Sequence, residues 1–112
     1  MTAEWKRHWD SVRISSLKDL FGVEKPVIGM VHLPPLPGAP GYTGYGIGAV
    51  IEAALADARA LARGGVDGII VENMWDLPYF VGRAVPPEES AAQAVAARAV
   101  VEEVSVPVGI NV

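Results

Sequence analysis

Three polar side chains in this sequence are of types that suit acid/base chemistry, and each closes a short apolar run. They are His32, Glu72 and Asn111, which end the stretches "VIGMVH", "GIIVE" and "VGIN". A histidine or a carboxylate can move a proton to or from a substrate, and an asparagine amide can orient the substrate through hydrogen bonds. We therefore predict catalytic roles for Glu72 and His32 and a substrate-binding role for Asn111.

Two further polar residues follow the second run. Asn73 comes directly after Glu72, and Asp76 lies in the next loop, so both are candidate substrate-binding residues. Each candidate also has a structural alternative, because His32 or Asn73 can bond to loop backbone and Asn111 or Asp76 can shape a turn. A carboxylate that closes a run of Ile-Ile-Val is expensive to bury without a partner, which favours a functional role for Glu72 over a structural salt bridge.

The same residues give only weak support for a metal site. His32, Glu72 and Asp76 offer acceptable nitrogen and oxygen ligands, but no tight spacing motif joins them. The glycines between positions 38 and 48 do not form a phosphate-binding loop, because the Lys-Ser/Thr ending is missing. The sequence therefore indicates no particular cofactor.

The elements that must position these residues alternate between helices and strands. Apolar residues at helical spacing predict one broken helix or two short ones between Trp5 and Phe21, a helix over residues 47–65, and another that begins near Pro86. Short apolar runs between breakers predict buried strands over 26–33, 66–73 and 106–112. Side chains two apart share a strand face, so all three polar ends are expected on one face at the carboxyl edge.

Alternating apolar strands and helices are typical of parallel α/β architecture, of which two closed forms are common. The doubly wound dinucleotide fold usually has a Gly-x-Gly-x-x-Gly turn after its first strand, whereas this chain continues with His-Leu-Pro-Pro. The eight-fold barrel is therefore favoured. In a barrel the polar strand ends point inward and upward, toward the mouth where barrel active sites lie.

Length and composition limit the classes of protein that fit. With 112 residues the chain is one domain or part of one, and its net charge of −4 makes nucleic acid a poor partner. No cysteine is present, and no apolar run is long enough to predict a signal peptide or a membrane span, so we expect a cytoplasmic protein. Basic residues near Trp5 and Trp9 would allow peripheral membrane contact, although a solvated helix face explains them better.

The motifs resemble those of a known family. "KPVIGMVHLPPLPGAPGY", "GGVDGIIVENMWDLPY" and "VPVGINV" are similar to successive N-terminal signatures of the BtpA/SgcQ family. The resemblance implies a (β/α)8 TIM barrel related to the ribulose-phosphate-binding barrels. Such a barrel needs about 250 residues, so we interpret residues 1–22 as a helical leader and 23–112 as the first three parallel strands and two helices.

The same resemblance implies two different functions. One is an enzyme that acts on a small sugar or sugar-phosphate-like substrate, in which His32, Glu72, Asn73, Asp76 and Asn111 match the polar positions of the family pattern. The other is a non-catalytic photosystem I biogenesis factor. Three strands leave exposed edges, so we expect self-association or a need for the remaining strands, and little activity from this chain alone; a truncated or split gene product is a third interpretation.

Overall fold

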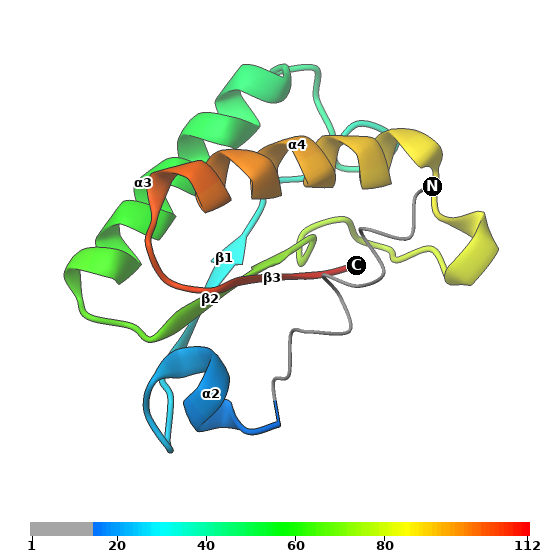
Figure 1. Cartoon of the computed structure of the whole chain (residues 1–112). Helices are drawn as coiled ribbons and strands as arrows, with labels where there is room; N and C mark the ends of the chain where they lie inside the picture. The colour runs from blue at the N-terminus through cyan, green and yellow to red at the C-terminus, as the bar shows by residue number, and fades with distance from the viewer. Residues whose placement is uncertain (1–14) are drawn as a thin grey trace, which may run out of the picture.

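The computed structural model describes residues 15–112 and shows the predicted alternation of helices and parallel strands (Figure 1). Its elements are α2 (Leu17–Phe21), β1 (Ile28–His32), α3 (Ile47–Arg63), β2 (Gly68–Glu72), the 3-10 turn η1 (Gly82–Ala84), α4 (Pro87–Glu103) and β3 (Val108–Asn111). The predicted N-terminal helix is present as α2, whereas its part over residues 5–14 lies outside the described residues. None of the helices within residues 15–112 has the length and apolar character needed to cross a membrane.

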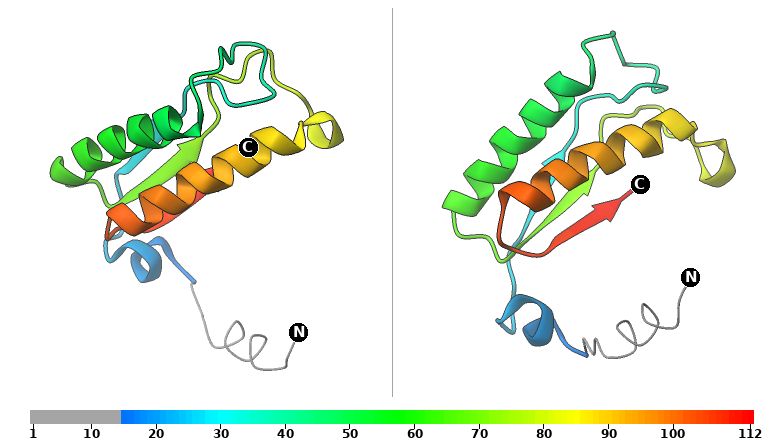
Figure 2. Two further views of the ribbon diagram at one scale, coloured as in Figure 1. Left: turned by 90° about the horizontal axis from the view of Figure 1, so that it is seen from above. Right: turned by 45° about the horizontal axis from the view of Figure 1, so that its top comes forward.

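The three strands form one parallel sheet in the order β1-β2-β3. Both α3 and α4 cover the same face of this sheet, while α2 lies on the opposite side (Figures 1 and 2). The fold is therefore an open α/β sheet with strands and helices in alternation. Each crossover helix returns the chain to the same end of the sheet, so all three strands finish at one edge.

The core lies between the sheet and the two long helices. Its buried members are Val31, Leu33, Leu36, Val50, Ala54, Ala58, Ile69, Val71, Ala92, Ala96, Ala97 and Val100. The helix residues in this set are mostly alanines, and such small side chains allow α3 and α4 to approach each other and the sheet closely. An ion pair between Arg59 and Glu103, with Nε and Oε1 2.6 Å apart, also joins the two helices at their exposed edge.

Within residues 15–112, the opposite face of the sheet is largely open. Ile28 and Met30 are exposed on it, and of the described elements α2 covers its lower end. Phe21 of α2 packs against Gly68, where a Cβ atom would lie 2.5 Å from the ring carbon Cε1. Glycine at position 68 therefore makes room for the aromatic ring at the amino-terminal end of β2.

The loop after β1 folds back onto the core. The Leu33 N–H donates to the Glu72 carbonyl oxygen at 3.0 Å, which extends the pairing of β1 and β2 by one residue, and then Pro34 and Pro35 end the strand because they lack an N–H donor. Leu36 is fully buried, and the hydroxyl of Tyr45 donates to the carbonyl of Pro35. The proline-rich segment is therefore packed over the carboxyl edge of the sheet.

Candidate functional site

The three predicted polar residues form one row across the carboxyl edge of the sheet. His32 pairs in register with Glu72, and Glu72 pairs with Asn111. The Nε2 atom of His32 lies 3.3 Å from Glu72 Oε2, and the amide nitrogen of Asn111 donates to Glu72 Oε1. Glu72 is thus held from both sides, through one oxygen each, on the open face of the sheet.

This geometry can support acid/base chemistry because the side chains of His32 and Glu72 remain partly exposed, at 36% and 23%. The side chain of Glu72 is less exposed than that of His32, and neither is buried. The contact between His32 and Glu72 is an ion pair only when the imidazole of His32 is protonated. The hydrogen bond from Asn111 restrains the side chain of Glu72, and the side-chain oxygen Oδ1 of Asn111 can accept a hydrogen bond from another group.

Asn73 and Asp76 lie behind this row rather than in it. Both are buried, and the Asn73 amide donates to Asp76 Oδ2 at 3.3 Å. The other oxygen, Asp76 Oδ1, accepts the backbone N–H of Leu36 at 2.8 Å. Asp76 therefore ties the β2–α4 loop to the β1–α3 loop. Of the two, only Asn73 reaches the wall of the neighbouring pocket.

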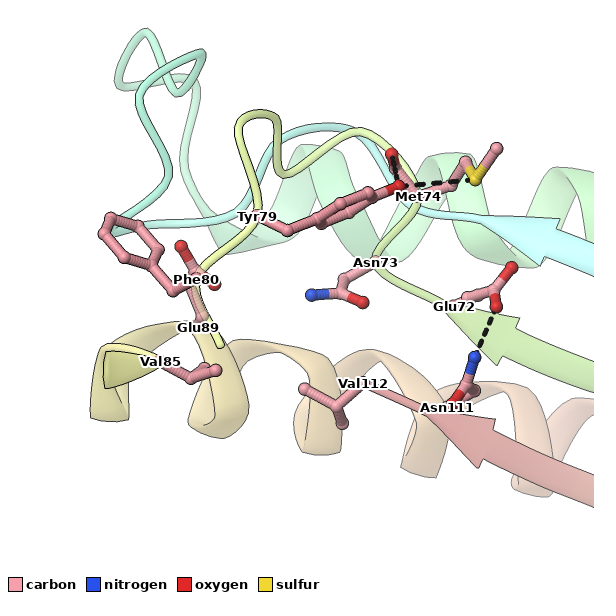
Figure 3. A pocket seen from close by; sticks show the side chains of 9 residues that line it. All are labelled: Glu72, Asn73, Met74, Tyr79, Phe80, Val85, Glu89, Asn111 and Val112. Carbon is pink, nitrogen blue, oxygen red and sulfur yellow. Dashed lines mark hydrogen bonds between the residues drawn. The ribbon is translucent and has the colours of Figure 1, made fainter. Parts of the chain in front are cut away.

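The pocket beside the row is a cavity of about 270 Å³ (Figure 3). It is lined by Glu72, Asn73, Met74, Tyr79, Phe80, Val85, Glu89, Asn111 and Val112. Two of the predicted catalytic and binding residues, Glu72 and Asn111, form one end, whereas His32 lies outside the lining. The size and the mixture of amide, carboxyl and aromatic groups suit a small hydroxyl-bearing molecule.

Tyr79 and Phe80 give the pocket an aromatic side that the candidate list from the sequence lacks. Tyr79 is oriented by its hydroxyl, which donates to the Met74 carbonyl at 2.5 Å. Aromatic residues in a long loop that follows a polar strand end indicate a pocket lining. The sequence does not show which of these aromatic side chains point into the pocket.

Two buried polar residues of α4 were also missed by sequence reasoning. The Gln93 amide nitrogen donates to the carbonyl oxygens of Val71 and Asn111, at 3.3 and 2.6 Å, so it holds the ends of β2 and β3 together. Glu89 lines the pocket, and burial is the main cause that raises its pKa, with the nearby carboxyl group of Asp76 as the second cause. The sequence did contain a signal for both, because Glu89 and Gln93 are long polar side chains four residues apart, on the same face of an alanine-rich helix.

A metal centre finds no further support in the described residues. Within residues 15–112, no group of three or more His, Asp or Glu side chains is arranged to hold a metal ion. His32 and Glu72 meet as a pair, and Asp76 is directed to backbone and amide donors instead.

Sequence comparison places this site in a known family. The profile of the BtpA family matches residues 23–112, which include all three strands and the whole polar row. The chain belongs to the BtpA family. This confirms the resemblance noted from the motifs.

Relatives come from archaea, enteric bacteria and cyanobacteria. An uncharacterised protein of Pyrococcus furiosus is 50% identical over 85% of this chain and 35% of its own length. The photosystem I biogenesis protein BtpA of Synechocystis is 49% identical over 82% of this chain and 31% of its own length. The putative sgc region protein SgcQ of Escherichia coli is 40% identical over 88% of this chain and 37% of its own length. The chain thus spans about a third of the curated relatives it matches, and no solved structure gives a significant match.

Proposed function

We propose that this chain supplies the first three strands of a (β/α)8 barrel enzyme that acts on a small sugar or sugar-phosphate-like substrate. The parallel order β1-β2-β3, with both crossover helices α3 and α4 on one face, is the arrangement that an N-terminal barrel segment requires. The open face would then be the interior of the barrel, and the carboxyl edge its mouth. Barrel enzymes place their active sites at that edge.

The observation that carries this proposal is the row in which Glu72 lies between His32 and Asn111. In the proposed reaction Glu72 transfers a proton to or from the substrate, and His32 assists by exchanging a proton with Glu72. Asn111 orients the substrate. Asn73 contributes an amide to the same wall, and Asp76 positions the loops above it. The aromatic side of the pocket would cover the apolar face of a sugar.

The complete site needs more strands than this chain provides. Because the chain spans about a third of its relatives' length, we propose that the remaining barrel strands, or a second copy of the chain, cover the open face. Light scattering combined with thermal unfolding tests this part. If the chain self-associates, we expect a discrete oligomer that unfolds cooperatively. A monomer that is stable and unfolds cooperatively would contradict the proposal that the open face must be covered.

Ligand mapping tests the proposed activity class directly. D-ribulose 5-phosphate and D-ribose are added separately to the ¹⁵N-labelled chain while backbone amide shifts are recorded. We expect the largest shifts at the strand ends around Glu72 and Asn111 and in the loop at Tyr79. If the chain is in the assembled form identified by light scattering, absence of shifts with both probes, or shifts confined to the outer surfaces of α3 and α4, would refute a sugar-binding mouth.

A second candidate function is a non-catalytic role in the biogenesis of photosystem I. It is favoured by the 49% identity with the Synechocystis protein whose name is photosystem I biogenesis protein BtpA. The test is complementation of a Synechocystis strain that lacks that protein. The strain receives either the full-length relative or this chain, and each of the two is tested with Glu and with Gln at the position of Glu72. Recovery of photosystem I independent of Glu72 would favour the non-catalytic role, and recovery that requires Glu72 would favour the enzyme.

A further inference from the structure

Gln93 of α4 lies at the point where the strands β2 and β3 end. Its side chain is 1% exposed, and its amide nitrogen Nε2 donates to the carbonyl oxygens of Val71 and Asn111, at 3.3 and 2.6 Å. A side-chain amide has two N–H donors, so these two carbonyls use both of them. Because both acceptors are oxygens, only the nitrogen of the amide can face them, and this fixes the orientation of the Gln93 side chain.

The two carbonyls belong to the backbone that carries the polar row. Glu72 follows Val71 along β2, and its register partner in β3 is Asn111, whose side chain donates to Glu72 Oε1. Gln93 reaches the strands from the face that α4 covers (Figure 2), whereas the row lies on the open face. The helix therefore holds the backbone of Asn111 from one face, and the side chain of the same residue contacts Glu72 on the other.

The oxygen of the Gln93 amide argues against a role in stability alone. Within residues 15–112 this atom, Oε1, is enclosed by protein and has no hydrogen-bond donor. A buried acceptor without a donor lowers the stability of a fold. An apolar side chain of the same length would avoid this cost but would release both carbonyls. The amide at this position is thus explained by the two carbonyls that its nitrogen holds.

We propose that Gln93 is a positioning residue of the site: by holding the carbonyls of Val71 and Asn111 it keeps the Asn111 amide on Glu72, and thereby maintains the affinity for the substrate, a consequence that rests on the proposed function. The pairing of β2 and β3 stops at Glu72 and Asn111, and the last pair of a ladder opens most easily. The spacing of the two strands at this pair sets the distance between the two side chains. The Gln93 amide bridges the strands at this point.

The side-chain amides of the chain allow a direct test. The sequence contains one glutamine and two asparagines, so three side-chain NH₂ signals are expected in a ¹⁵N–¹H spectrum. Gln93→Met keeps the length of the side chain and removes both donors. Val100→Ala is the matched control, because Val100 is buried in the core about two turns further along the same helix. The Asn111 NH₂ signal is recorded for the three proteins, and the affinity for D-ribulose 5-phosphate is measured in the assembled form.

In Gln93→Met the Asn111 signal should move toward the position of a free amide, and the affinity for D-ribulose 5-phosphate should fall about 3- to 10-fold, the effect of one lost hydrogen bond. Val100→Ala should lower stability and leave both readouts unchanged. A purely structural role for Gln93 predicts this same result for Gln93→Met. In the unmodified chain we expect the Gln93 amide hydrogens to exchange slowly with solvent, because they are buried and bonded.

An unmoved Asn111 signal in folded Gln93→Met would overturn the positioning role. Rapid exchange of the Gln93 amide hydrogens in the unmodified chain would overturn it as well, and this measurement needs no variant to fold. A moved signal with unchanged affinity would overturn the contribution to substrate binding while the proposed function stands. If D-ribulose 5-phosphate binds to none of the three proteins, the proposed function and the contribution of Gln93 to binding fail together for this probe, while the Asn111 signal still decides the positioning role.

Discussion

Replacement of Leu36 by alanine tests whether the proline-rich loop is part of the core. Leu36 is 0% exposed, although it lies outside every helix and strand. Leucine-to-alanine changes at buried sites cost about 2–5 kcal/mol, through lost transfer energy and the cavity left behind. We expect about 3 kcal/mol for Leu36→Ala, because the backbone bond to Asp76 survives the substitution and keeps the loop in place.

The assay is urea unfolding followed by circular dichroism, with Leu77→Ala as the matched control. Leu77 lies in the neighbouring loop and is 49% exposed, so its replacement should change the free energy of unfolding by roughly 0.5 kcal/mol or less. A loss below about 1 kcal/mol for Leu36→Ala, or equal losses for both variants, would show that the loop above the site does not pack on the core.

Two further predictions concern the packing of α2 against the open face of the sheet and the buried carboxyl group of Glu89. Gly68→Ala should displace the ring of Phe21 and lower stability by about 1–3 kcal/mol, while Gly109→Ala, where a Cβ finds its nearest neighbour at 3.6 Å, should be nearly neutral; equal losses would refute the packing of α2. The folded-state pKa of Glu89 lies above its unfolded value, so the stability it contributes at low pH is lost as pH rises through the folded pKa. Urea midpoints across that range should therefore fall less steeply in Glu89→Gln than in the control Glu52→Gln, whose glutamate is exposed on α3, and equal slopes would contradict a raised pKa.

The strands and the polar row could be predicted because both follow from local pattern. An apolar run that is short, β-branched and bounded by breakers predicts a strand, and a period of two assigns each side chain to a face. Parallel pairing then brings the last residues of successive strands to one edge. His32, Glu72 and Asn111 consequently meet in register, as the sequence predicts.

The burial of Glu89 and the pocket could not be predicted because both depend on the path of a long loop. Glu89 sits in the first turn of α4, where an acidic residue is expected on the basis of the helix dipole alone. Its burial depends on how the loop of residues 73–86 folds, and that loop also carries Asp76, whose charge raises the pKa of Glu89. The packing of Phe21 under Gly68 likewise depends on where the short helix α2 docks, which helical periodicity does not specify.

The account depends most on Glu72 as the residue that binds and acts on the ligand. The decisive measurement is the affinity for D-ribulose 5-phosphate of the unmodified chain, of Glu72→Gln and of Glu52→Gln, whose glutamate is exposed on α3. Loss of a charge-assisted hydrogen bond predicts at least about a 10-fold weaker affinity for Glu72→Gln and no change for Glu52→Gln. Equal affinity in all three proteins would contradict a site centred on the strand-end row.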